Sequence, residues 1–171
     1  KDKLISQDAQ DTFALVSAVR KLTRKCLITK LSPNVISIAE IALAAQNAGS
    51  DAVALINTLG GMSIDVHKRI PRLGAWVGGL SGPAIRPVAV KMVWEAYNKI
   101  KIPIIGMGGI MDTESALEFF IAGATAISVG TANFINPRVS LEIICGLKQY
   151  LADNSIQNLS NLTGRLKACK D

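Results

Sequence analysis

The sequence has 171 residues, of which 49% are hydrophobic, and a formal net charge of +6 at pH 7. A chain of this length and composition predicts one globular domain and excludes a disordered protein. No apolar run approaches the roughly 18 residues that a membrane span needs. The charged opening, residues 1–10, does not resemble a signal peptide. We therefore expect a cytoplasmic protein that has no membrane partner.

Apolar periodicity predicts alternating helices and strands along the chain. Asp8 and Ser37 are placed to cap the first two helices, and Glu40 would complete a capping box with Ser37. Four short apolar segments are typical of strands that are buried on both faces of a parallel sheet. The predicted helices begin near residues 8, 37, 87, 112 and 137, and the predicted strands cover 26–31, 52–56, 102–105 and 126–129.

Two stretches lie outside this alternation. Residues 57–83 form a long predicted loop, and loops of that length inside a compact domain usually carry function. Residues 154–171 are polar and are predicted to form a C-terminal tail with a short helix near 159–166.

The positive charge does not point to a nucleic-acid partner. The cations are scattered or gather on predicted helix faces, as at residues 20–25, and only two Trp and two Tyr accompany them. Recognition of single-stranded RNA depends on aromatic side chains on which bases stack. We therefore interpret the cations as solvated side chains, although their sign suits an anionic ligand.

Cysteine and histidine give no sign of a metal site. The three cysteines, Cys26, Cys145 and Cys169, match neither a disulfide framework nor a metal-binding spacing. Cys26 is predicted to lie in a strand and Cys145 in a helix, so we expect both to be small core residues. Cys169 belongs to the predicted tail, and His67 is expected to be an exposed loop residue.

Glycine turns follow two of the predicted strands. The strand that begins at Ile102 runs into a turn with glycine at 106, 108 and 109, and the strand 126–129 ends in Gly130-Thr131. Glycine permits positive φ, so consecutive backbone N–H groups can converge on an anion. The two turns predict one phosphate site at adjacent strand ends, and two ordinary tight turns are the alternative interpretation.

Unusual residues follow all four predicted strands at their carboxyl ends. Lys30 ends the first, Asn57 and Thr58 follow the second, and the glycine turns follow the other two. Active sites of (β/α)8 barrels lie at this edge, with phosphate commonly bound after strands seven and eight. We therefore predict an α/β fold in which residues 1–171 form the C-terminal half of a TIM barrel, about strands 5–8.

A complete barrel takes roughly 250 residues and eight strands. Half a barrel would expose two strand edges to solvent, which favours aggregation. We therefore expect this chain to be a fragment of a longer polypeptide, or a half that pairs with another chain.

Five motifs resemble the C-terminal half of the dihydroorotate dehydrogenases, most closely the class 1B catalytic flavoproteins. The resemblance runs from about residue 8 to residue 150, and the motifs are Lys30–Asn34, Ile56–Asp65, Gly78–Pro83, Ile105–Ile110 and Val129–Phe134. The family is a flavin-dependent TIM barrel that oxidises dihydroorotate to orotate in pyrimidine biosynthesis.

The resemblance implies FMN as the cofactor. Lys30 would lie against the pyrimidine edge of the flavin, where a cation stabilises the negative charge of the reduced ring. The alternative for Lys30 is a lysine that extends from a strand end into solvent. The Ile56 backbone and Gly82 would contact the flavin or its ribityl chain, and a loop bend before Pro83 is the alternative for Gly82. Backbone N–H groups would hold the phosphate at Gly108, Gly109, Gly130 and Thr131.

The resemblance also assigns the substrate site. Asn57 and Thr58 would hydrogen-bond the carboxylate and ring amides of dihydroorotate or orotate. The alternative is that these two side chains only stabilise a turn at the end of a strand.

The catalytic base of class 1 enzymes is a cysteine on a loop upstream of the first helix of this chain. No residue here corresponds to that cysteine, so no catalytic residue is assigned, and Cys26 has no activating neighbour in the sequence. We expect residues 1–171 alone not to turn over dihydroorotate. In class 1B, electrons pass to NAD through a second subunit that carries FAD and an iron–sulfur cluster, which implies a homodimer or a heterotetramer.

Two other functions stay open at this point. A TIM-barrel isomerase or synthase acting on a sugar phosphate would share the two glycine turns, and a non-catalytic remnant would fold without turnover. The sugar-phosphate enzyme would not need Lys30 paired with Asn57 and Thr58.

Overall fold

Four parallel strands form the sheet at the centre of the computed structural model, which describes residues 5–168. Their order in the sheet is β1-β2-β7-β8, so spatial order follows chain order as in a barrel wall. The strands are β1 (Ile28–Lys30), β2 (Ala52–Leu55), β7 (Ile104–Gly106) and β8 (Ala126–Ile127). The predicted α/β class and parallel sheet are confirmed, and the arrangement is that of a partial TIM barrel.

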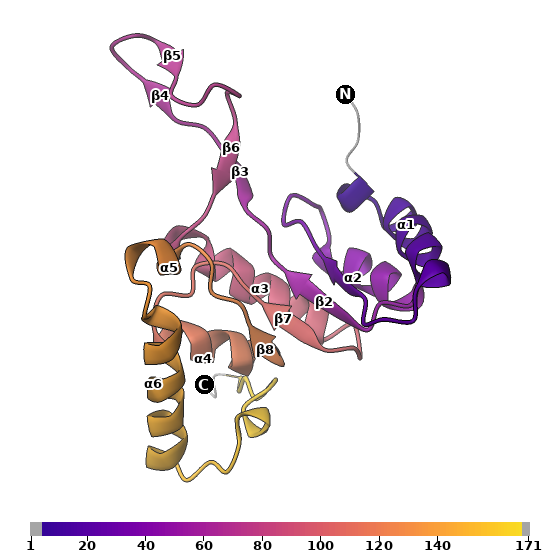
Figure 1. Ribbon diagram of the computed structural model, residues 1–171, viewed down its shortest axis with the longest axis vertical. Helices are drawn as coiled ribbons and strands as arrows, with labels where there is room; N and C mark the ends of the chain where they lie inside the picture. Colours follow the sequence, from indigo (N-terminus) through magenta and orange to yellow (C-terminus); the bar gives the residue numbers. More distant parts are fainter. Residues whose placement is uncertain (1–4, 169–171) are drawn as a thin grey trace.

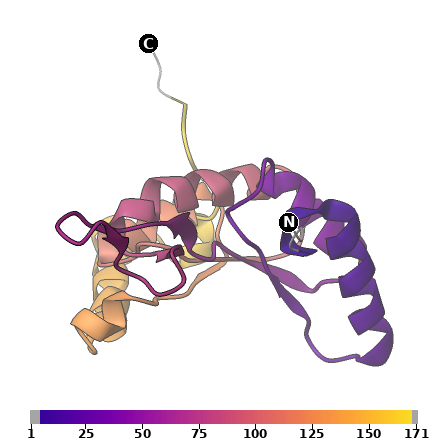
Figure 2. The same cartoon turned by 90° about the horizontal axis from the view of Figure 1, so that it is seen from above.

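Helices connect the strands and lie along the outer side of an open arc (Figure 2). Each of the pairs α1–α2, α2–α3, α3–α4 and α4–α6 is in contact. The α-helices are α1 (Ala9–Leu22), α2 (Ile38–Asn47), α3 (Arg86–Tyr97), α4 (Thr113–Ala122), α5 (Ala132–Ile135) and α6 (Val139–Asp153). Single 3₁₀ turns are η1 (Ile5–Gln7), η2 (Pro83–Ile85) and η3 (Leu159–Asn161). Among residues 5–168, no helix has both the length and the apolar content to cross a membrane.

Capping residues begin the helices largely as the sequence predicts. Asp8 caps α1, and the Ser37 side chain accepts the Glu40 backbone N–H. The predicted capping box at Ser37 is only half formed, because the Glu40 carboxylate pairs with Lys99 at 3.4 Å instead of returning to the cap. A full capping box forms at Asp112 with Ser115, at the start of α4.

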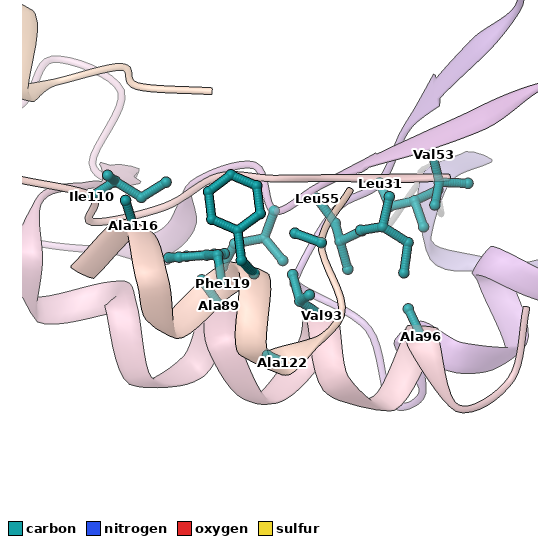
Figure 3. Packing of buried hydrophobic residues seen from close by; sticks show 14 of the residues in the cluster. Leu31, Val53, Leu55, Ala89, Val93, Ala96, Ile110, Ala116, Phe119 and Ala122 are labelled. Carbon is teal, nitrogen blue, oxygen red and sulfur yellow. The ribbon is translucent and has the colours of Figure 1, made fainter. Parts of the chain in front are cut away.

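The core lies between the sheet and helices α3 and α4 (Figure 3). Phe119 is its largest fully buried side chain, and Val53 of β2 and Val93 of α3 are also fully buried. A Cβ atom on Gly106 would lie 2.6 Å from Phe119 Cδ1, so the phenyl ring packs directly against the β7 backbone. The ring therefore sets the distance between α4 and the strand that leads into the glycine turn.

The cysteine predictions need correction. Cys26 lies before β1 and is exposed, because strand pairing begins only at Ile28. Cys145 does lie in α6, but on its solvent face, since Ile143 and Leu147 take the buried positions of that helix. Cys169 lies outside the described residues. His67 is exposed in a turn, as predicted.

The segment predicted as a long loop contains two antiparallel strand pairs instead. The pairs are β3 (Leu59–Gly61) with β6 (Gly78–Leu80), and β4 (Ile64–Asp65) with β5 (Ile70–Pro71). We call residues 59–80 the arm, and it projects away from the sheet (Figure 1). The Asp65 carboxylate closes the tip by accepting the N–H groups of His67 and Lys68, each at 3.1 Å.

The described part of the C-terminal segment returns to the body of the molecule. The Gly164 N–H donates to the Phe120 carbonyl at 3.1 Å, and Leu162 is buried. Only η3 forms where a short helix near 159–166 was predicted, so that helix is limited to a single 3₁₀ turn.

Replacing Phe119 by Ala should lower the free energy of unfolding by about 3–5 kcal/mol, because a fully buried ring would leave a cavity beside β7. Denaturant titration measures the change. Phe134→Ala is the matched control, because the Phe134 side chain is 91% exposed and its loss should change little. Equal losses from the two variants would contradict the packing described for α4.

The capping box at Asp112 predicts a pH dependence of stability. Hydrogen bonds from the Ser115 hydroxyl and backbone N–H hold the pKa of Asp112 below its ordinary value of 3.8. The ionised carboxylate therefore stabilises the fold above that pH, and its contribution is lost as the pH falls through the lowered pKa. Ser115→Ala should reduce the loss of unfolding free energy between about pH 5 and pH 2. A pH profile identical to that of the unmodified chain would count against the box.

Candidate functional site

One pocket of about 200 Å³ lies at the carboxyl ends of the four parallel strands. All nine sequence-predicted site residues line it: Lys30, Ile56, Asn57, Thr58, Gly82, Gly108, Gly109, Gly130 and Thr131. They come from positions up to 101 apart in the sequence, since Lys30 is the last residue of β1 and Thr131 follows β8. Parallel pairing explains why these residues lie close together, because it brings the carboxyl ends of all four strands to the same edge of the sheet.

The glycine turn after β7 has the conformation that its sequence predicts. Gly108 and Gly109 have φ of 125° and 80°, a region that L side chains rarely adopt. A Cβ atom on Gly109 would lie 2.8 Å from both the Gly82 carbonyl oxygen and Arg86 Cβ. Glycine at 109 therefore lets this turn pack directly on the loop that leads into α3.

Four backbone N–H groups at the two turns are available to a ligand. Among the hydrogen bonds of residues 5–168, none has the N–H of Gly108, Gly109, Gly130 or Thr131 as its donor. The space beside Gly130 is also open, because a Cβ atom there would meet nothing within 4 Å. The arrangement can bind an anion through main-chain donors alone.

The exit from the glycine turn is rigidly held. The Ser115 hydroxyl oxygen accepts the N–H groups of Met111 and Asp112, each at 2.9 Å. Ser115 is fully buried and donates in turn to the Asp112 carboxylate. The C-terminal side of the turn is thus held by the packing of Gly109 and by the cap of α4.

Lys30 lies at the polar end of the pocket. Its side chain is exposed, and within the described residues it has no carboxylate within salt-bridge distance. A second hollow of about 260 Å³ adjoins the pocket and shares Lys30, Asn57 and Thr58 with it. An uncompensated cation and two hydrogen-bonding side chains therefore face the space that both hollows share.

Sequence reasoning missed Ser81 as a pocket residue. The Thr131 hydroxyl donates to Ser81 Oγ at 2.9 Å, across 50 positions of sequence. This bond ties the loop before α3 to the turn after β8, and both segments line the pocket. Ser81 stands beside Gly82 in the motif Gly78–Pro83, which was the signal available in the sequence.

The chain is similar to known proteins over most of its length. Residues 3–151 match the family model described as dihydroorotate dehydrogenase. Proteins named dihydroorotate dehydrogenase B (NAD(+)), catalytic subunit, from Desulforamulus reducens and Trichlorobacter lovleyi are each 53% identical to this chain, over 92% and 90% of it. One of the same name from Desulforudis audaxviator is 54% identical over 90% of the chain. The matched part is 52%, 51% and 50% of these relatives, so the chain spans about half their length.

Gly109→Ala should lower the free energy of unfolding by roughly 1–3 kcal/mol, because a side chain there is strained at positive φ and collides with the Gly82 carbonyl. Gly74→Ala is the control, since a Cβ atom at Gly74 would meet nothing within 4 Å. Chemical denaturation compares the two variants. A harmless change at 109 would be inconsistent with the close packing of the turn.

Proposed function

This chain belongs to the dihydroorotate dehydrogenase family, and on that premise we propose that it forms the flavin- and substrate-binding part of a protein that oxidises dihydroorotate to orotate in pyrimidine biosynthesis. One observation carries the proposal: the residues that the family resemblance assigns to cofactor and substrate line a single pocket at four strand ends. In this proposal residues 1–171 supply about strands 5–8 of a flavin-binding barrel.

The two glycine turns fit the phosphate of FMN. Main-chain N–H groups at Gly108, Gly109, Gly130 and Thr131 have no partner among the described residues, and they lie at the ends of adjacent strands. A phosphate accepts several such donors at once, and glycine allows the backbone to approach it closely. Gly82 and the Ile56 backbone would then contact the rest of the cofactor, because both line the same pocket.

Lys30 supplies the positive charge that the proposed reaction needs. Bound FMN would supply the hydride acceptor. Because Lys30 has no carboxylate partner among residues 5–168, its charge is free to stabilise negative charge beside the pyrimidine edge of the flavin. Stabilising the negative charge of the reduced flavin is the role in turnover that the sequence predicts for Lys30.

Asn57 and Thr58 would bind and orient the substrate. Both lie in the hollow next to Lys30, where a carboxylate can meet the ammonium group and the Asn57 amide together. Asn57 is exposed and Thr58 is partly buried, and together they would hydrogen-bond the carboxylate and the ring amides of the substrate. Orientation of the ring against the flavin would follow from these contacts.

The names of the relatives bear on the partner of this protein. They describe catalytic subunits of NAD(+)-named enzymes, which implies at least one other subunit in those proteins. We propose by analogy that electrons from the flavin pass to a second subunit, which would carry FAD and an iron–sulfur cluster and would reduce NAD. A homodimer of catalytic subunits within a heterotetramer would accommodate both chains.

Flavin titration tests the cofactor assignment. FMN should bind this chain at least about tenfold more tightly than riboflavin, or about 1.4 kcal/mol, because riboflavin lacks the phosphate that the two turns hold. Quenching of flavin fluorescence measures both dissociation constants. Equal affinity for the two flavins would contradict the phosphate site, and a preference for ribose 5-phosphate over FMN would favour a sugar-phosphate enzyme.

Lys30→Met should lower the affinity for reduced FMN relative to oxidised FMN by about fivefold, the value of one unit-charge interaction of about 1 kcal/mol near water. Anaerobic titration with dithionite-reduced and oxidised FMN measures this ratio. Lys148→Met, on the exposed face of α6, controls for the general loss of charge. An unchanged ratio in the Lys30 variant would remove Lys30 from the flavin site.

A further inference from the structure

Residues 57–60, which we call the arm root, are held by a side chain to which the sequence assigned no role. Asn34 lies in the loop after β1, and its carboxamide contacts the backbone of the segment that leaves β2. We propose that Asn34 is a positioning residue of this site, which holds the arm root so that Asn57 and Thr58 face Lys30. This inference rests on the proposed function, because it deepens the assignment of the substrate-binding pair.

The Asn34 carboxamide forms the two hydrogen bonds to the arm root that a peptide group of a neighbouring β-strand would form. Its Nδ2 donates to the Thr58 carbonyl at 3.1 Å, and its Oδ1 accepts the Gly60 N–H at 3.0 Å. These two backbone groups flank Leu59, at the start of β3, and the opposite side of the arm root pairs with β6. One side chain thus uses both a donor and an acceptor to complete a strand that is otherwise paired on one side.

Asn34 is itself held in place. Its backbone N–H and its Nδ2 both donate to Ser32 Oγ, at 3.2 and 3.3 Å, and its carbonyl accepts from Gln7 Nε2 at 3.1 Å. Pro33, between Ser32 and Asn34, is buried. The carboxamide is therefore presented in a defined orientation, and few rotamers remain to be lost when it binds the arm.

The same contacts set the position of Asn57 and Thr58 relative to Lys30. The Asn57 N–H donates to the Leu31 carbonyl at 3.1 Å, immediately after Lys30. The two hydrogen bonds of Asn34 add to this one. Three hydrogen bonds therefore join the backbone of residues 57–60, the segment that carries the polar pair, to the loop that directly follows Lys30 at the end of β1.

The packing of Thr58 depends on the same alignment. A Cβ atom on Gly79 would lie 2.3 Å from Thr58 Oγ1, so β6 rests directly on the Thr58 side chain. A shift of the arm root would press β6 on this side chain or withdraw it from the hollow. A displacement of about 1 Å in a reacting site can lower the rate about a hundredfold. A residue that prevents the shift therefore affects the geometry of the bound ligand without touching the ligand.

Asn34→Ala separates positioning from general support of the fold. In the FMN-loaded chain, the variant should bind orotate about tenfold more weakly, the loss expected when a misplaced Asn57 or Thr58 forfeits about one hydrogen bond to the ligand. FMN affinity should stay within about twofold, because the phosphate turns follow β7 and β8. Amide hydrogen exchange at Gly60 should become at least about tenfold faster, since this N–H loses its acceptor. Asn98→Ala is the matched control, because Asn98 Nδ2 donates to the Trp94 carbonyl at the end of α3.

A second variant keeps half of the interaction. Asn34→Asp retains an acceptor for the Gly60 N–H and loses the donor to the Thr58 carbonyl, so exchange at Gly60 should stay slower than in Asn34→Ala. Comparing the exchange rates of the two variants requires no ligand. It decides whether Asn34 holds the arm root in place even if the alanine variant loses stability.

The outcomes distinguish this inference from the proposed function. Unchanged orotate affinity and unchanged exchange at Gly60 in Asn34→Ala would overturn the positioning role. An equal loss of orotate and FMN affinity would also overturn it, since that result indicates general support of the fold. If the unmodified chain binds neither FMN nor orotate, the proposed function fails, and accelerated exchange at Gly60 in Asn34→Ala would still support the pinning of the arm root.

Discussion

Parallel pairing of β1, β2, β7 and β8 is the constraint on which the rest of the structure depends. It brings the ends of four strands to one edge. A lysine, an Asn-Thr pair and two glycine turns lie at these strand ends and line the pocket. Helices α3 and α4 hold the sheet from the outer side, and Phe119 packs against the β7 backbone where Gly106 leaves room. The pocket is therefore a consequence of strand order and of one close helix–strand contact.

The pocket combines two kinds of recognition. One end offers main-chain donors from glycine turns, which bind an anion by geometry and need no side chain. The other end offers Lys30 with Asn57 and Thr58, which can respond to the charge and shape of a ligand. A cofactor with a phosphate at one end and a redox-active ring at the other would match this division, and Asn34 would maintain the polar end by holding the arm root.

Most of the site could be predicted from local chemistry, because glycine at positive φ, a cation at a strand end and an Asn-Thr pair each leave a mark in a few consecutive residues. Ser81 and Asn34 stand within two of the recognised motifs, but their roles could not be predicted locally, since their partners lie 50 and 24 or more positions away. The arm was missed for a similar reason. Its strands are two or three residues long, too short for a period of two to be read.

By itself the sequence determined the alternation of helices and strands, the caps at Asp8 and Ser37, and the two glycine turns, because each depends on residues within one turn of chain. Only the tertiary structure decided which residues are buried and which segments meet. Cys26 and Cys145 have the composition of core residues, yet both are exposed, because burial depends on the surface that faces a side chain. The tertiary structure also decided that the carboxamide of Asn34 completes β3, since a hydrogen bond between distant segments exists only once the sheet has brought them together.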